Sequence, residues 1–253
     1  MSAQSIGWDS RPRPTMAIVV ALYLMIPHGV SAGEGQPAVQ AEVEKMLRDD
    51  LDLEQVAVAL AGSEVTLTGP VATFWDKNEA INRTLALDGV ETVASELTIP
   101  GAEDDAGIAE EVVEAIRTYR FITIWDYVGG GVIDGVVTLN GTVTPDRDKS
   151  GDLFERVAKI PGVQDVQMRI VQQSASRRDN DLRRGIAARA LRHPALSHYT
   201  LVADVPPFRI VVDQAVVTLV GAVRSGVESN ILESITRQSF ETREVVNLLQ
   251  YPQ

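Results

Sequence analysis

Three five-residue segments of the chain share one pattern, in which apolar and polar side chains alternate before a glycine. They are residues 65–69, 137–141 and 217–221, with the pattern Val-Thr-Leu-x-Gly. Alternation with a period of two is typical of a β-strand that buries one face. The closing glycine suits a tight turn that requires freedom in φ. Three copies predict a module that is repeated along the chain.

The residues around the first copy predict a small unit of two helices and three strands. Apolar side chains recur at helical spacing in residues 38–49, and residues 56–60 alternate as a strand that forms a hairpin with the motif strand. A second helix over residues 73–87 and a last strand over residues 90–99 complete the unit. A right-handed crossover through the second helix makes the last strand parallel to the motif strand.

The same order of elements follows twice more, which predicts an α+β protein of three tandem small αββαβ modules. Each module is expected to hold a three-stranded mixed sheet and two helices. We place the modules at residues 38–100, 106–172 and 178–250. The third is divergent, because it lacks the Gly-Val pair that follows the second helix of the others at Gly89 and Gly162. Gly89 is expected to end that helix.

Glycines are the second recurring feature of the modules. Those that we expect to fix the backbone are Gly69, Gly89, Gly141, Gly162 and Gly221. In the second module, Gly129, Gly130 and Gly131 are predicted to form a flexible hairpin loop. No Gly-Lys-Ser/Thr sequence follows them, so they do not resemble a phosphate-binding loop.

The first 32 residues have the pattern of a secretory signal peptide, cleaved after Ala32. Arg11 and Arg13 precede an apolar run over residues 16–26. A membrane-spanning helix needs about 20 apolar residues, so we expect cleavage rather than an uncleaved anchor, and no transmembrane span in the mature chain. The chain has no cysteine, which fits export to the periplasm better than a disulfide-stapled secreted domain.

The chain is acidic, with a formal net charge of −12 at pH 7. Long-range repulsion therefore opposes binding to nucleic acid. Basic residues gather around the first helix of the third module, and guanidinium groups recognise phosphates and lipid surfaces well. This candidate anionic-ligand patch consists of Arg177, Arg178, Arg183, Arg184, Arg189 and Arg192. The alternative is an arginine-rich face that only contacts water.

Trp125 and Tyr127 form a candidate interface, because each side chain has an apolar body and a polar tip. Core filling or packing between modules is the alternative. No residues have the spacing of a catalytic or metal site: His193 and His198 flank Pro194, and the absence of cysteine excludes thiol catalysis. We therefore expect no enzyme activity, no metal and no cofactor.

The Val-Thr-Leu-x-Gly strand, the helix after it and the later Gly-Val-x-x-Val segment resemble the BON-domain family, named for a bacterial osmotically inducible periplasmic protein and nodulation proteins. These features are complete in the first two modules and partial in the third. The resemblance implies the αββαβ fold, a periplasmic or envelope location, and association with phospholipid head groups or envelope proteins. It also implies a role in osmotic or envelope stress and no enzyme activity. The alternative function is a periplasmic protein-interaction scaffold or chaperone-like adaptor.

Overall fold

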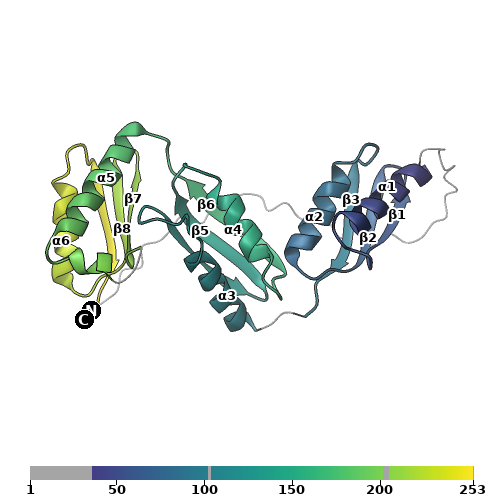
Figure 1. The fold of residues 1–253 in the computed structure, drawn as a ribbon, viewed down its shortest axis with the longest axis horizontal. Coiled ribbons are helices and arrows are strands. Elements are labelled where there is room, and N and C mark those ends of the chain that lie inside the picture. The colour runs from purple at the N-terminus through teal and green to yellow at the C-terminus, as the bar shows by residue number, and fades with distance from the viewer. Residues whose placement is uncertain (1–35, 102–103, 202–204, 253) are drawn as a thin grey trace, which may run out of the picture. The chain divides into compact units, whose positions relative to one another are not determined.

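The computed structural model describes residues 36–101, 104–201 and 205–252. Within them the chain forms three three-stranded sheets, each with helices packed on it (Figure 1). The predicted fold class, three tandem αββαβ units with mixed sheets, is confirmed. The predicted signal peptide over residues 1–32 lies outside the described residues.

The first module has β2 at the centre of its sheet. Its elements are α1 (Gln36–Asp49), β1 (Ala57–Ala61), β2 (Glu64–Pro70), α2 (Phe74–Leu85) and β3 (Thr92–Thr98). β1 pairs with β2 in the antiparallel direction, and β3 pairs with β2 in the parallel direction. α2 begins with a capping box, in which the side chains of Thr73 and Asp76 each accept a hydrogen bond from the other residue's backbone N–H.

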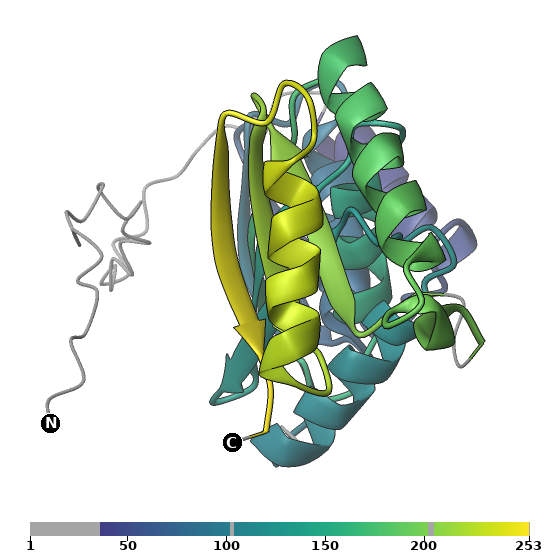
Figure 2. The same cartoon turned by 90° about the vertical axis from the view of Figure 1, so that its left-hand side faces the viewer.

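The other two modules repeat this topology. The second contains α3 (Asp105–Arg117), β4 (Tyr127–Ile133), β5 (Val136–Val143), α4 (Lys149–Ala158) and β6 (Asp165–Gln172). The third contains α5 (Arg177–Arg192), a 3₁₀ turn (Ser197–Leu201), β7 (Phe208–Asp213), β8 (Val216–Ala222), α6 (Gly226–Arg237) and β9 (Glu244–Gln250). In both, the hairpin is antiparallel and the last strand runs parallel to the central one. Figure 2 shows α5 and α6 beside each other on one face of the third sheet.

The motif strand supplies the centre of each hydrophobic core. Its valine and leucine are fully buried in all three modules, at Val65, Leu67, Val137, Leu139, Val217 and Leu219. Removing such a side chain from water stabilises a fold by about 1.5–3 kcal/mol. The alternation that the sequence shows is therefore the alternation between the helix-covered face of the sheet and its other face.

The motif glycines lie inside the strands and not, as predicted, at turns. Gly69, Gly141 and Gly221 have φ values of 134°, 135° and 107°, which L side chains rarely adopt. A Cβ at Gly69 would come within 2.5 Å of the carbonyl oxygen of Gln55, because the hairpin partner approaches closely there. The glycine is needed for this backbone contact, since any side chain would collide with main-chain atoms.

The second helix of the first two modules ends before the predicted glycine. α2 ends at Leu85, and Gly89 lies in the turn before β3 with a φ of 87°; Gly162 has a φ of 82° in the equivalent turn. The third module places Glu241 at this position, three residues before its last strand, with a φ of 77°. The divergent third module therefore keeps this backbone conformation without a glycine. The conformation is energetically unfavourable for Glu241, because this residue has a Cβ.

The three consecutive glycines of the second module are not a loop. Gly129, Gly130 and Gly131 lie within β4 and pair with β5. The prediction of a hairpin loop was wrong because glycine marks a strand as well as a turn when another backbone approaches closely. A Cβ at Gly130 would come within 2.2 Å of the carbonyl oxygen of Thr138 on β5.

Candidate functional site

The arginines of the predicted patch do not share one environment. Arg177, Arg178, Arg184, Arg189 and Arg192 are exposed. Arg183 is 1% exposed and lies on the side of α5 that also carries the buried Ile186 and Ala190. Arg183 is therefore not a member of a surface patch. The helical spacing of Arg183 from these apolar residues was the signal in the sequence that could have identified it as buried.

Arg183 connects α5 to the sheet of its own module and to the end of the preceding one. Its Nη1 donates to Oδ1 of Asn180 (2.6 Å), and its Nη2 donates to Oε1 of Gln173 (2.8 Å) and to the carbonyl oxygen of Val212. Burial lowers the pKa of Arg183, while the negative charges of Asp179 and Asp213 oppose this shift. No carboxylate within the described ranges forms a direct ion pair with Arg183, so its direct hydrogen bonds go to neutral acceptors.

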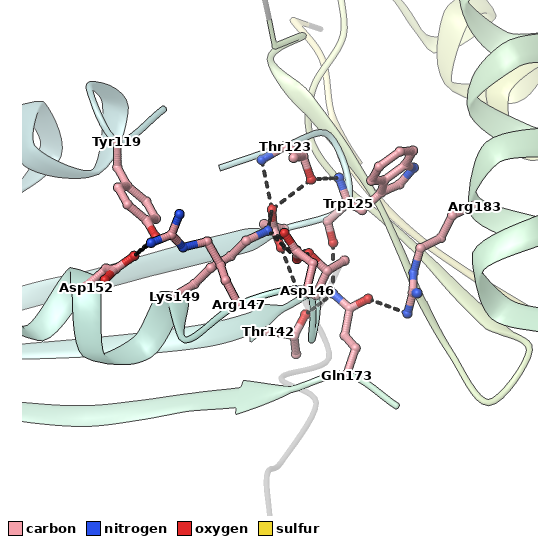
Figure 3. Close-up of polar contacts among 12 residues, drawn as sticks. Tyr119, Thr123, Trp125, Thr142, Asp146, Arg147, Lys149, Asp152, Gln173 and Arg183 are labelled. Atoms are coloured by element: carbon pink, nitrogen blue, oxygen red, sulfur yellow. Dashed lines mark hydrogen bonds and ion pairs between the residues drawn. The ribbon is translucent and has the colours of Figure 1, made fainter. Parts of the chain in front are cut away.

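Gln173 carries this connection into the second module (Figure 3). Its Nε2 donates to the carbonyl oxygen of Trp125 (2.8 Å), and the indole of Trp125 packs against the core of the third module. The backbone N–H of Ile210 on β7 also donates to the carbonyl oxygen of Ile124 (2.8 Å). The second and third modules are therefore joined by backbone and side-chain hydrogen bonds as well as by apolar contact.

The two aromatic residues predicted as one interface lie in different places. Trp125 precedes β4 and lies at the junction of the second and third modules, as the alternative of packing between modules expected. Tyr127 is the first residue of β4 and is 38% exposed. The structure therefore does not unite them in a single surface.

A buried ion pair lies beside this junction, and no pattern in the sequence predicts it. Nζ of Lys149 is 2.9 Å from Oδ2 of Asp126, and both side chains are fully buried. Asp126 also accepts hydrogen bonds from the backbone and hydroxyl groups of Thr123 and Thr144, at 2.7–2.9 Å. Lys149 lies 3.0 Å from Asp146 as well (Figure 3). These contacts compensate for the desolvation of both charges.

A cavity of about 440 Å³ lies over the junction. Its lining includes Trp125, Arg183 and Arg184 together with Asp146 and Thr144. The structure thus brings two of the predicted arginines and one of the predicted aromatics to the same cavity. Desolvation raises the pKa of the exposed Asp146, but hydrogen bonds from Thr144 and Lys149 outweigh it and lower the pKa, so this carboxylate also places negative charge there. A cavity with charges of both signs gives an anionic ligand no clear electrostatic advantage.

The exposed face of α5 is more strongly cationic than the cavity over the junction. Arg177, Arg184 and Arg192 are spaced by seven and eight residues, so they share one side of the helix. Neither Arg177 nor Arg192 has an ion-pair or hydrogen-bond partner among the described residues, and Arg184 contacts the exposed Asp181. We call these three residues the arginine stripe.

An exposed aromatic ring lies next to this helix. Phe240, in the turn after α6, is 89% exposed. Its neighbours in the chain contact α5: Glu241 accepts a hydrogen bond from Nε of Arg178 (3.0 Å), and the hydroxyl of Ser239 accepts one from Arg189. The turn therefore places a large apolar side chain beside the arginines of α5.

Within the part of the chain that the structure describes, no three His, Asp or Glu side chains come together in a way that could hold a metal ion. Nδ1 of His193 accepts a hydrogen bond from the backbone N–H of Ala195, which occupies one of its ring nitrogens locally. None of the described helices is both long and apolar enough to span a bilayer.

Comparison with known proteins identifies one module. Residues 37–101 match the family model of the BON domain. No curated protein matches the chain. The match supports an envelope protein without a catalytic role.

Some solved structures are distantly similar. The C-terminal domain of CdsD, a structural protein of the type III secretion system of Chlamydia trachomatis, is 11% identical, with 84% of this chain and 96% of that chain covered and a TM-score of 0.24. The periplasmic domain of PrgH is 12% identical, with 81% and 99% covered and a TM-score of 0.19.

Proposed function

We propose that the protein is an exported, non-enzymatic envelope protein that binds anionic phospholipid through its third module. The observation that carries this proposal is the arginine stripe of α5 together with the exposed ring of Phe240. Guanidinium groups form strong hydrogen bonds with phosphate. Moving an exposed phenyl ring from water into the head-group region lowers the free energy. The BON-domain match in the first module supports an envelope location and a role in osmotic or envelope stress.

Co-flotation of the purified protein with vesicles tests this function. We expect binding to vesicles that contain phosphatidylglycerol, weaker binding at high salt, and no binding to phosphatidylcholine alone. Arg177→Glu/Arg192→Glu should abolish binding at low salt, because two attractions become repulsions. Phe240→Ser should weaken binding without changing its salt dependence.

Arg48→Glu/Arg83→Glu is the matched control. It changes the net charge by the same amount at two exposed positions of the first module. If both double variants lose binding equally, net charge and not the arginine stripe governs association. If neither loses it, the third module is not the lipid-binding surface.

A second candidate function is a protein-interaction scaffold in the envelope. The observation that favours it is an apolar groove beside an edge strand of the second module. For such a scaffold, an acidic surface is no disadvantage.

A further inference from the structure

The second module has a groove between α3 and the edge strand β4, with a volume of about 870 Å³. Its apolar lining comes from both elements and from the segment between them: Val112, Val113, Ile116, Ile122, Val128 and Val132. Val113 is 63% exposed at this groove. We call this feature the β4 groove.

A missing side chain explains why the groove occurs in this module. Gly130 pairs with Leu139, as Val58 pairs with Leu67 in the first module and Ile210 pairs with Leu219 in the third. Ile210 is fully buried and Val58 packs against its own core, whereas Gly130 is exposed. The second module therefore lacks the side chain that fills the space between helix and edge strand in its neighbours.

The edge of β4 also offers main-chain hydrogen-bonding groups. β4 pairs with β5 on one side only, so its other side is unpaired within the described sheet. Exposed edge strands accept an added strand, in which main-chain hydrogen bonds give affinity and alternate side chains enter adjacent pockets. A Cβ at Gly131 would meet nothing within 4 Å, so no packing contact requires glycine there. A glycine in such a place is typical of close approach by another backbone.

The charges of the groove select the partner. Its charged lining residues are Arg117, Arg120 and Arg209, and no carboxylate lines it. The guanidinium of Arg117 is already paired with Glu114 on the same helix, at 2.7 Å. The guanidinium of Arg120 lies over the ring of Phe121, 4.5 Å from its centroid, and makes no ion pair with a carboxylate in the described ranges. In a chain with a net charge of −12, a groove lined only by cations is complementary to an acidic partner.

We propose that the β4 groove binds an extended, acidic peptide segment of an envelope protein by adding it as a strand to β4. Apolar side chains at alternate positions of the peptide would enter the space opposite Gly130, and its carboxylates would meet Arg120 and Arg209. Although Arg209 of its lining belongs to β7 of the third module, this site shares no residue with the arginine stripe or Phe240, and neither proposal depends on the other.

Fluorescence anisotropy with the full chain tests the proposal. The probe is a fluorescein-labelled octapeptide of alternating threonine and valine that ends in two aspartates. Two comparison peptides end in lysines or carry proline at the central positions, where proline removes N–H donors. We expect the acidic peptide to bind about 10-fold more tightly than the basic one, which corresponds to about 1.4 kcal/mol, and the proline peptide not to bind.

Two variants locate the site. Ala109→Phe places a ring in the groove from α3, and Arg120→Glu reverses a charge in its lining; each should weaken binding of the acidic peptide by about 10-fold or more. Ala106→Phe, at an exposed position of α3 outside the groove, and Arg48→Glu are the matched controls and should leave binding unchanged.

Three outcomes would overturn the proposal. The first is equal binding of the acidic and basic peptides, and the second is peptide binding that neither groove variant changes. The third is displacement of the peptide by phosphatidylglycerol vesicles that then bind through the groove.

Vesicle flotation distinguishes failure of the peptide proposal from failure of the lipid-binding function proposed above. Arg177→Glu/Arg192→Glu should affect flotation and not peptide binding, whereas Ala109→Phe should do the reverse.

Discussion

Lys149 and Asp126 are the clearest example in this protein of buried charged side chains that stabilise each other. Both side chains are fully buried and are compensated by each other and by the threonines around Asp126. A buried charge that loses its partner destabilises a protein more strongly than the intact pair stabilises it. The pair therefore makes the position of α4, which begins at Lys149, sensitive to substitution.

Lys149→Met should lower the free energy of unfolding by about 3–5 kcal/mol, because Asp126 would remain buried without a cation. Urea denaturation followed by circular dichroism measures this change. Lys159→Met is the control, since Lys159 forms an exposed ion pair with Glu155 on the same helix region. The control should change stability by less than about 1 kcal/mol. Equal effects of the two substitutions would show that the buried pair has no special role.

The burial of some side chains could be predicted from the sequence, and the burial of others could not. The burial of Val65 and Leu67 follows from period-two alternation, which local sequence displays directly. The burial of Arg183 depends on acceptors from Gln173 and Val212, which are distant in the sequence. The same applies to the pairing of Asp126 with Lys149, because no local pattern identifies a partner across two elements.

At the scale of elements, the segment between β6 and α5 is fastened to the hairpin of the third module. The backbone N–H of Ser174 donates to Oδ1 of Asp213 at the end of β7 (2.8 Å), and the hydroxyl of Ser174 donates to the same oxygen. Asp179 accepts hydrogen bonds from the backbone N–H groups of Gln214 and Ala215 in the following turn. Carboxylates therefore fix the β7–β8 turn to the start of α5.

Acidification should loosen this arrangement. The hydrogen bonds from Ser174 lower the pKa of Asp213, and the charge of Arg183 acts in the same direction. Because the folded-state pKa lies below the unfolded one, the stabilisation is present above about pH 4 and is lost as the pH falls through the folded-state pKa.

We expect the free energy of unfolding to decrease between pH 6 and pH 3, and to decrease less in Asp213→Asn. Urea midpoints at several pH values measure both slopes. Asp181→Asn, at an exposed position of α5, is the control and should keep the slope of the unchanged protein. A slope that Asp213→Asn does not alter would assign the acid sensitivity to other carboxylates.

Strand pairing explains why the glycines of β4 were incorrectly predicted to form a loop. Three consecutive glycines are typical of a loop when only the local sequence is considered. Their strand conformation depends on β5, which pairs with each of them. Pairing with a neighbouring strand therefore overrode a local preference, as it commonly does for β-structure.

At the scale of the whole molecule, the second and third modules share interactions that the first module does not enter. Trp125, Gln173 and Arg183 connect the two cores. The first module contacts the second through Phe74 and Trp75, whose rings lie 6.2 and 6.1 Å from the ring of Phe154. We therefore expect the second and third modules to unfold together.

Arg183→Met should uncouple them, because it removes the donors to Gln173 and Val212. Hydrogen exchange along a urea gradient measures the effect: β5 and β8 should lose protection at one urea concentration in the unchanged protein and at two in the variant. The expected loss is about 1–3 kcal/mol of coupling. Arg184→Met, its exposed neighbour, should preserve a single transition. Separate transitions in the unchanged protein would contradict the shared unit.

The motif glycines have a consequence for how such an array can diverge. Gly69, Gly141 and Gly221 are held by backbone contact alone, so their requirement is independent of the side chains on the rest of the module. A copied module that keeps this glycine and the buried valine and leucine of the motif strand can change the residues on its surface. Gly130 in one copy and Phe240 in another are changes of this kind. Duplication followed by such local change lets one chain acquire different binding partners on modules of unchanged architecture.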